Sequence, residues 1–337
     1  MFKDKVLLDH GSGGLASQDL IRDIFLKHLD NPFLADLEDS AVIGEIGGRL
    51  VFTTDSYVVD PLFFPGGDIG SLSVYGTIND LAMRGASPVC LSLGFILEEG
   101  FALFDLERIV SSIARACEKA GVVVAAGDTK VVPRGKGDGI FINTSGLGFL
   151  AVDLNISASR ARTGDQIILS GTLADHGITI LTQRSGLELE GDFVSDSMPL
   201  HFLVRELGDF LGEGLHTLRD PTRGGLATSL CEIAGSSGVG ITIEERALPV
   251  KPGVSSACEI LGLDPLYIAN EGKCLVLVEA GMADEALKIM RRRPEGRDAA
   301  IIGSVTGGSP DKVEMVTGIG GRRLITPLAG EPLPRIC

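Results

Sequence analysis

Apolar positions in the first half of the chain follow the periods of alternating strands and helices. Residues 49–54 are typical of a β-strand that ends at Asp55. From Asp68 onward the apolar spacing predicts an amphipathic helix that ends near Arg84. A strand over 89–97, a helix over about 106–117 and a strand over 122–126 follow. This order predicts an α/β fold.

The second half shows the same alternation after a polar stretch. Its predicted strands begin at Gln166 and cover 240–243, 274–278 and 300–302, and its predicted helices cover about 199–208, 225–235 and 284–292. A chain of 337 residues is long for one core and natural for two domains. We expect an N-terminal domain over 1–154, a C-terminal α/β domain over 155–330 and a tail over 331–337.

Composition and charge narrow the classes of partner. The chain is 44% hydrophobic, with 45 glycines and no tryptophan, as in a soluble protein with many tight turns. A formal charge of -15 argues against nucleic acid or an anionic membrane as the main partner. An anionic nucleotide held by metal ions is still compatible with it. The start of the chain has no secretory apolar region, and no apolar stretch is long enough to span a bilayer.

The six cysteines are scattered, with neither a CxxC pair nor a disulfide-like spacing, so we expect a reducing cytoplasm. Cys90, Cys117 and Cys274 lie in apolar patterns and are expected in the core. Cys337 is the exception, because it ends a segment that Pro332 and Pro334 stiffen. A terminal thiol is hard to bury and is available for reaction. The alternative is a frayed end with an incidental thiol.

Four acidic residues adjoin the ends of predicted strands or helices: Asp39, Asp55, Asp80 and Asp128. Carboxylates that converge on hard cations can hold Mg²⁺ against a triphosphate. Asp80 lies near the C-terminal end of its helix, where an acid opposes the helix dipole, so a bound cation is one reason for its presence. The alternative is a solvated carboxylate. Lys130, close to Asp128, is placed to neutralise phosphate charge.

Two glycine-containing segments are candidates for anion binding. In Gly11-Ser12-Gly13-Gly14 the backbone N–H groups can point together at a phosphate, although most glycine clusters are turns. Residues 219–226 lead through a proline and two glycines into a helix whose N-terminus can receive an anion, or they form an ordinary helix-initiating turn. The chain contains no Walker A pattern and no kinase signature. His176, His201 and His216 lack metal-ligand spacing and indicate no site.

The order of several motifs resembles the aminoimidazole ribonucleotide synthetase (PurM-like) superfamily, which also contains selenophosphate synthetase and thiamine-monophosphate kinase. After the glycine-rich start, the motifs are Glu38-Asp39-Ser40-Ala41, Thr53-Thr54-Asp55, Asn79-Asp80-Leu81-Ala82-Met83-Arg84-Gly85-Ala86 and Gly127-Asp128-Thr129-Lys130. Within the superfamily, the terminal Pro334-Arg335-Ile336-Cys337 resembles the signature of the HypE family of hydrogenase-maturation factors. The resemblance covers essentially the whole chain.

The resemblance implies a two-domain fold in which the N-terminal sheet pairs with that of a second subunit, forming a dimer barrel with nucleotide sites near the interface. It also implies a reaction. Members of this family receive a carbamoyl group on the terminal cysteine from the carbamoyltransferase HypF and use ATP to dehydrate it to a thiocyanate. The cyano group then passes to iron held by a HypC–HypD complex.

The resemblance also assigns roles to residues. The catalytic residues it implies are Cys337, Glu271 and Lys130, with Glu271 assisting proton removal. It implies that Mg²⁺ is held by Asp39, Asp55, Asp80, Asp128 and Asp220, and that ATP is bound by Gly11, Ser12, Gly13, Gly14, Asn79, Asp80, Thr129 and Lys130. From the sequence alone, Glu271 is a loop carboxylate before an apolar strand.

Two other functions are compatible with the sequence. The first is another ATP-dependent synthetase or kinase of the superfamily that acts on a small phosphorylated metabolite, with Cys337 incidental. The second is a nucleotide-binding scaffold whose tail is a docking peptide for an assembly complex. The number of acidic candidates argues mildly against the scaffold.

Overall fold

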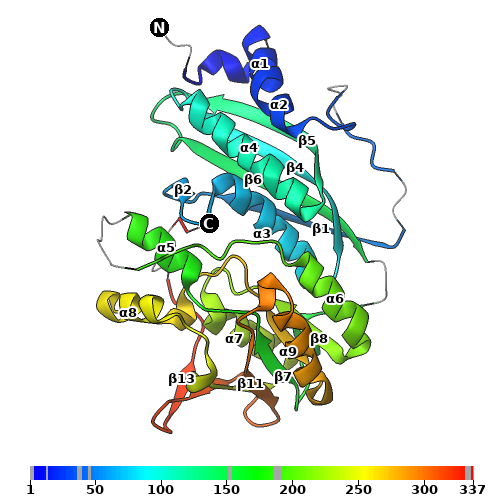
Figure 1. Ribbon diagram of the computed structural model, residues 1–337, viewed down its shortest axis with the longest axis vertical. Helices are drawn as coiled ribbons and strands as arrows, with labels where there is room; N and C mark the ends of the chain where they lie inside the picture. Colours follow the sequence, from blue (N-terminus) through cyan, green and yellow to red (C-terminus); the bar gives the residue numbers. More distant parts are fainter. Residues whose placement is uncertain are drawn as a thin grey trace.

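The computed structural model describes residues 4–12, 14–35, 40–44, 47–150, 154–184, 191–330 and 335–336. Its two larger sheets define an upper and a lower unit in Figure 1. The predicted boundary near 155 falls between the last strand of the first sheet and the earliest strand of the second. None of the described helices is both long and apolar enough to cross a membrane.

The first unit contains a four-stranded sheet in the order β1-β6-β4-β5. Its strands are β1 (Arg49–Tyr57), β4 (Ser87–Glu98), β5 (Val123–Val132) and β6 (Ile140–Leu150), and its helices are α1 (Leu15–Leu20), η2 (Ile21–Leu26, π-helical), α2 (Lys27–Leu29), α3 (Ile69–Met83) and α4 (Leu103–Ala120). Only β4 and β5 run parallel among these pairs. Helices α3 and α4 cover one face of the sheet (Figure 1).

The opposite face of this sheet exposes apolar side chains. Leu50 and Phe52 on β1 are 62% and 69% exposed, and Ile96 on β4 is 46% exposed. Side chains alternate between the two faces of a strand, so the neighbours of these residues point toward α3 and α4. An exposed apolar sheet face of this kind is typical of a protein interface.

The second unit contains a seven-stranded sheet in the order β13-β12-β9-β11-β7-β10-β8. Its strands are β7 (Gln166–Leu169), β8 (Leu215–Arg219), β9 (Gly240–Glu244), β10 (Leu275–Val278), β11 (Ala300–Thr306), β12 (Val313–Val316) and β13 (Arg322–Ile325). Its helices are α5 (Asp175–Arg184), α6 (His201–Leu211), α7 (Gly225–Ser237), α8 (Pro252–Leu261) and α9 (Ala283–Arg291). The sequence pattern predicted β7, β9, β10, β11, α6, α7 and α9 but not α5, α8, β8, β12 or β13.

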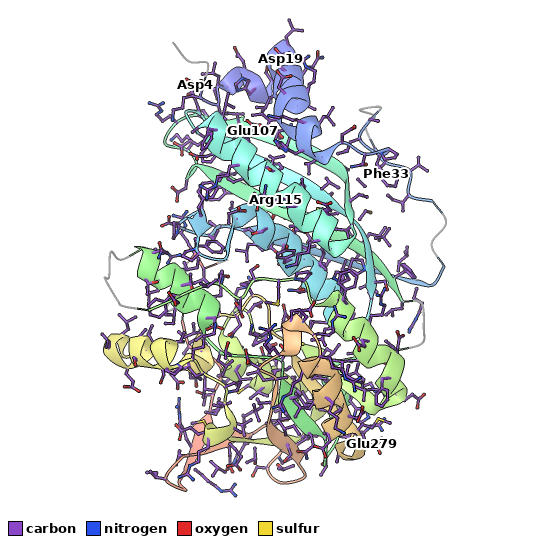
Figure 2. All side chains as sticks on the ribbon, viewed as in Figure 1. Asp4, Asp19, Phe33, Glu107, Arg115 and Glu279 are labelled. Carbon is purple, nitrogen blue, oxygen red and sulfur yellow. The ribbon has the colours of Figure 1, made fainter. Side chains whose placement is uncertain are left out.

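Helix α3 is buried by both units. Leu72 and Ile78 belong to the core of the first unit, whereas Ala82 and Met83 belong to a core cluster built from α6, α9 and the second sheet. Side chains fill the space between the units (Figure 2). The expectation of an amphipathic helix was wrong, because α4, α6 and the first sheet together leave α3 almost no exposed face.

Two strands continue beyond their predicted ends. Asp55 lies inside β1, which runs on to Tyr57, and Asp128 and Lys130 lie inside β5, which runs on to Val132. Alternating or β-branched residues continue past each acid, so the strand does not stop where its first apolar run stops.

The expectation that three cysteines lie in the core is confirmed. Cys90, Cys117 and Cys274 are buried free thiols.

Candidate functional site

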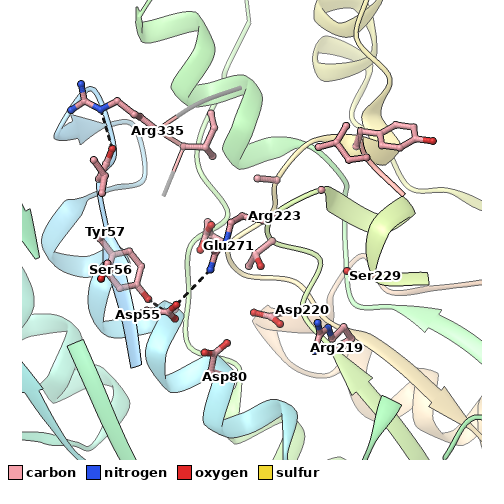
Figure 3. Close-up of a pocket in the computed structure, with 18 of the residues that line it drawn as sticks. Asp55, Ser56, Tyr57, Asp80, Arg219, Asp220, Arg223, Ser229, Glu271 and Arg335 are labelled. Atoms are coloured by element: carbon pink, nitrogen blue, oxygen red, sulfur yellow. Dashed lines mark hydrogen bonds and ion pairs between the residues drawn. The ribbon is translucent and has the colours of Figure 1, made fainter. Parts of the chain in front are cut away.

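Five acidic side chains line one cavity of about 940 Å³, which we call the acidic cavity (Figure 3). One of them, Glu232, is paired with Arg219, and the other four carry the argument below. Asp55 comes from β1 and Asp80 from α3 in the first unit. Asp220 directly follows β8, and Glu271 lies in the loop before β10 in the second unit. The cavity is therefore built where the two units meet.

Hydrogen bonds hold the two carboxylates of the first unit. Thr53 Oγ1 donates to Asp80 Oδ2 at 2.8 Å, and Tyr57 Oη donates to Asp55 Oδ2 at 3.4 Å. The exposed Arg223 guanidinium lies 3.8 Å from Asp55 Oδ1. Because this arginine is exposed, it neutralises Asp55 weakly.

The carboxylates of the acidic cavity repel one another. Burial, followed by the neighbouring Asp80, raises the pKa of Asp55 to about 6. Burial, followed by Asp80, raises the pKa of Asp220 to about 7. Burial also raises the pKa of Glu271 well above its ordinary value, with further contributions from Asp196, Asp220, Asp55 and Asp80. A cavity with this charge favours a bound cation.

The donor set fits Mg²⁺ that arrives with a phosphate ligand. Asp55, Asp80 and Asp220 supply hard oxygen ligands from three different elements. Within the described ranges, no three acidic, histidine or cysteine side chains are close enough together to bind a metal by themselves. Mg²⁺ is commonly held by one or two carboxylates plus substrate phosphates, so a preformed protein cage is not required. The predicted carboxylates do share one cavity, but they are spaced more widely than the ligands of a closed metal site.

Glu271 is 3% exposed and is held through its backbone. Its N–H donates to Asp196 Oδ1 at 3.1 Å, and its carbonyl accepts from Asn79 Nδ2 at 3.1 Å. Among the described residues, none is a hydrogen-bond partner of Glu271 Oε1. This oxygen is thus unpaired within the described part of the chain, while the backbone of Glu271 is fixed by both units.

Asn79 connects the units. Its Nδ2 also donates to Met198 O at 3.0 Å, and its Oδ1 accepts from Leu200 N at 2.8 Å. The side chain is 1% exposed, and both of its N–H groups are occupied. We therefore expect Asn79 to position Glu271 instead of contacting the nucleotide as predicted.

Gly272 fits only because it lacks a side chain. A Cβ at this position would lie 1.8 Å from the carbonyl oxygen of Asp196. On the other side of Gly272, Lys273 Nζ lies 3.4 Å from Asp196 Oδ2, and both of these side chains are buried. The glycine thus lets the loop that carries Glu271 approach the 195–197 segment closely.

The described end of the tail reaches the same cavity. Arg335 and Ile336 are among the residues that line it, and Ile336 is 5% exposed. Asp60 N donates to Arg335 O at 3.2 Å, and His176 Nε2 lies 2.9 Å from Ile336 O. Cys337, whose catalytic role the resemblance implies, lies outside the described residues.

A second pocket of about 230 Å³, here called the edge pocket, contains four of the other predicted ligands. Gly11 lies against Asp128, Thr129 and Lys130 of β5, and a Cβ on Gly11 would be 2.6 Å from Val131 N. Asp128 and Lys130 are exposed and 3.5 Å apart. The remaining lining is mostly apolar and comes mainly from α1, the π-helical segment, β4 and β5.

The structure does not bring the two sets of predicted ligands together within one chain. Asp55 lies on β1 and Asp128 on β5, at opposite edges of the sheet. Two strands intervene, so the edges are about 14 Å apart at roughly 4.8 Å per strand spacing. One copy therefore cannot place Asp128 and Lys130 beside Asp55, Asp80 and Asp220.

The remaining predicted residues are distributed as follows. Ser12 Oγ donates to Asp9 O at 2.8 Å, and Gly14 precedes α1 as its N-cap. Gly13 and Asp39 lie outside the described residues. Of the described residues in the glycine cluster, Gly11 lines the edge pocket, whereas Ser12 and Gly14 do not.

Sequence reasoning missed several residues around the acidic cavity. Tyr57 could have been found, because it is two positions from Asp55 and shares its strand face. His176 and Asp196 carried no local signal, since their partners are distant in the chain. His176, dismissed for its lack of metal-ligand spacing, contacts the tail across 160 positions.

Comparisons with known proteins agree over the whole chain. Residues 37–150 match AIR synthase related protein, N-terminal domain, and residues 162–316 match the C-terminal domain of the same family. The carbamoyl dehydratase HypE of Azotobacter vinelandii is 54% identical over 328 residues, which cover 97% of this chain and 96% of the relative.

Two solved structures are similar as well. A crystal structure of hydrogenase maturation protein HypE in complex with ATP is 51% identical, with a TM-score of 0.95 over 98% of this chain and 99% of the other. A HypE–HypF complex contains a chain that is 48% identical, with a TM-score of 0.81 over 92% of this chain and 99% of the other.

Charge repulsion in the acidic cavity should make the stability of the ligand-free protein depend on pH. The folded pKa values of about 6 for Asp55 and 7 for Asp220 exceed the unfolded value of 3.8. Their contribution to stability is therefore fully present below about pH 4 and is lost as the pH rises through 6 to 7. Asp80→Asn should raise the Tm at pH 8 by roughly 2–4 °C, for a repulsion of about 1 kcal/mol, and change it much less at pH 5.

Thermal unfolding of both proteins at the two pH values tests this. Asp209→Asn is the matched control, because Asp209 also lies near the C-terminal end of a helix, α6, but is exposed. It should shift the Tm equally at both pH values. An equal shift for Asp80→Asn would contradict the proposed repulsion.

Gly272→Ala should destabilise the protein by about 1–3 kcal/mol or more, because its Cβ overlaps the Asp196 carbonyl. Gly281→Ala is the control, since a Cβ there has nothing within 4 Å. Denaturant unfolding measures both variants. Equal stability of the two variants would refute the close approach of the 195–197 segment to the Glu271 loop.

Proposed function

The chain belongs to the HypE family of carbamoyl dehydratases, and from this premise we propose how its residues carry out the reaction. The enzyme uses ATP to dehydrate an S-carboxamide on its C-terminal cysteine, Cys337, to a thiocyanate. This supplies the cyanide ligand for the iron of [NiFe] hydrogenase. ATP and the carbamoyltransferase HypF are its cosubstrate and its partner.

One observation supports Cys337 as the reacting residue. Ile336 lines the acidic cavity together with Glu271 and the carboxylates, and a single peptide bond joins it to Cys337. Ile336 is buried, and consecutive Cα atoms are about 3.8 Å apart, so a reaction at the residue that follows Ile336 would take place close to this cavity. The tail is thus the substrate-bearing part of the site.

The chemistry requires the carboxamide oxygen to leave, and hydroxide is a poor leaving group. The oxygen attacks the γ-phosphorus of ATP, the bond to ADP breaks, and one N–H proton is lost. The C–O bond then breaks with phosphate as the leaving group, and loss of the second N–H proton completes the C≡N bond. Carboxamide and ATP thus give thiocyanate, ADP and phosphate.

We propose that Glu271 accepts a proton from the amide. Its Oε1 is buried and has no hydrogen-bond partner among the residues that the structure describes, so it is available to a group that enters the cavity. Repulsion from Asp55, Asp80 and Asp220 contributes to its raised pKa. A cation bound by those carboxylates would remove that contribution and lower the pKa of Glu271, so that nucleotide binding would favour its basic form.

Asp55, Asp80 and Asp220 are the residues that would hold Mg²⁺, and Asp39 is kept as a further proposed ligand. When bound, the ion neutralises negative charge on the phosphates. The three carboxylates would place the ion next to the described end of the tail, which lines the same cavity. Their mutual repulsion is the feature that supports cation binding here.

Asp128 and Lys130 enter this scheme through a second copy of the chain. We propose a homodimer that covers the exposed apolar face carrying Leu50, Phe52 and Ile96, because this area is costly to leave in water. Asp128 and Lys130 lie on the edge strand and are exposed. Pairing of the two sheets would bring Lys130 of one copy to the nucleotide of the other, with Gly11, Ser12, Gly13, Gly14 and Thr129 beside it.

The tail must also serve partners. We propose that it leaves the cavity to receive the carbamoyl group from HypF and to pass the cyano group to a HypC–HypD complex. The free thiols Cys90, Cys117 and Cys274 support a reducing, cytoplasmic location. The proposed units are 1–154, 155–330 and the reactive tail 331–337.

The reaction is tested on protein carbamoylated by HypF. The C-terminal peptide should lose the mass of one water when MgATP is added, and ADP should form. Glu271→Gln should slow this loss by about 10²–10⁴-fold, as expected when a general base is removed. Peptide mass spectrometry in single-turnover samples measures both.

Glu279→Gln is the control, because Glu279 is an exposed carboxylate at the end of β10 in the same unit. It should dehydrate at the rate of the unaltered protein. An unchanged peptide mass despite ATP turnover would refute the dehydratase assignment and favour a small phosphorylated metabolite as the substrate.

A further inference from the structure

The backbone of the tail is held by residues that the reaction scheme does not use. Arg335 O accepts from Asp60 N at 3.2 Å and from the guanidinium of Arg184. Ile336 O lies 2.9 Å from His176 Nε2. This second carbonyl belongs to the peptide bond that joins Ile336 to Cys337, so the contact fixes the amide plane from which the reactive residue extends.

The protonation of His176 follows from its partners. A carbonyl oxygen only accepts hydrogen bonds, so Nε2 carries the hydrogen that Ile336 O receives. His176 Nδ1 lies 2.8 Å from Ser195 Oγ, and Ser197 N donates to the same Oγ at 3.2 Å. The serine hydroxyl therefore donates to Nδ1. Ser195 thus sets the tautomer in which Nε2 faces the tail.

The surroundings of His176 are those of a fixed, neutral imidazole. The side chain is fully buried, and burial lowers its pKa. The ring of Phe64 packs against it edge-on, with 5.5 Å between ring centroids. A buried imidazole of this kind donates one hydrogen bond in one direction, toward the tail.

The segment that orients His176 also orients Glu271. Ser195 contacts the imidazole, and the next residue, Asp196, accepts from Glu271 N at 3.1 Å. Ser195 N is anchored to Pro65 O of the first unit at 2.9 Å. Gly66 accommodates this crossing, since it has a positive φ and a Cβ on it would lie 2.7 Å from Ser195 O. One short segment thus sets the positions of the base and of the tail relative to each other.

We propose that His176 is a positioning residue that retains the inserted tail through the Ile336–Cys337 peptide bond, with Ser195 holding it in the donating tautomer. This inference rests on the proposed dehydration at Cys337. The hydrogen bond exists only while the tail lies in the cavity, so it favours dehydration and opposes the steps for which the tail must leave. His176 sets the balance between the two positions of the tail.

The test measures the two kinds of step separately. His176→Phe keeps an aromatic ring but removes the donor, and loss of one hydrogen bond should lower the ratio of inserted to released tail roughly 2- to 10-fold. Single-turnover dehydration of carbamoylated His176→Phe should therefore slow, by at most that factor. Its carbamoylation by HypF should be as fast as in the unaltered protein or faster. His176→Gln, which restores an N–H near the position of Nε2, should recover much of the dehydration rate.

A second readout does not depend on activity. Alkylation of Cys337 in the uncarbamoylated protein, followed by mass spectrometry of the C-terminal peptide, should be faster in His176→Phe and in Ser195→Ala. An unchanged alkylation rate, or equal slowing of carbamoylation and dehydration, would overturn the proposed role of His176. If the unaltered carbamoylated protein lost no water, the proposed function would be refuted. If the unaltered protein lost water and His176→Phe lost it at the same rate, this inference alone would be refuted.

Discussion

The burial of α3 between the two units is the constraint on which the rest of the site depends. Its N-terminal part belongs to the core of the first unit, and Ala82 and Met83 belong to a core cluster of the second. Asp80 and Asn79 precede those residues on the same helix. Any shift of one unit against the other would therefore move the Asp80 carboxylate and the backbone contact that holds Glu271. Packing on both sides of α3 therefore fixes the position of this helix in the cavity wall.

The site combines unfavourable electrostatics with firm backbone anchoring. Asp55, Asp80, Asp220 and Glu271 share one cavity, which costs folding free energy while the carboxylates are ionised. The backbone of Glu271 is nevertheless bonded to Asn79 and Asp196 from two directions. Polar groups that are fixed in advance require little reorganisation when charge develops. Binding of a cation together with phosphates would offset the repulsion between the ionised carboxylates of the folded protein.

The sequence predicted which elements exist better than it predicted where the strands end and how they are ordered in the sheet. The helix over 69–83 and most strands followed from apolar spacing, but β1 and β5 run past the points where their first apolar runs end. The placement of Asp55 and Asp128 at strand ends was therefore wrong. Asp128 and Asp55 lie at opposite edges of the sheet because of the strand order, and the local pattern of apolar residues does not contain that order.

The residues around the tail were beyond prediction for a different reason. Each is defined by a contact between distant segments, as His176 with Ile336 and Asn79 with Glu271. A buried histidine among apolar neighbours has the pattern of an ordinary core residue. Motif resemblance indicated Glu271 and Asp220 because they lie in recognisable loops, whereas Ser195 and Asp196 lie in an extended segment without a motif.

The central claim is that ATP activates the carboxamide oxygen on Cys337. The most direct measurement uses protein that carries an isotope-labelled oxygen in that carboxamide, followed through one turnover with MgATP. The account predicts that the label appears in inorganic phosphate, one labelled oxygen for each thiocyanate formed. Label released into water, with unlabelled phosphate, would contradict it.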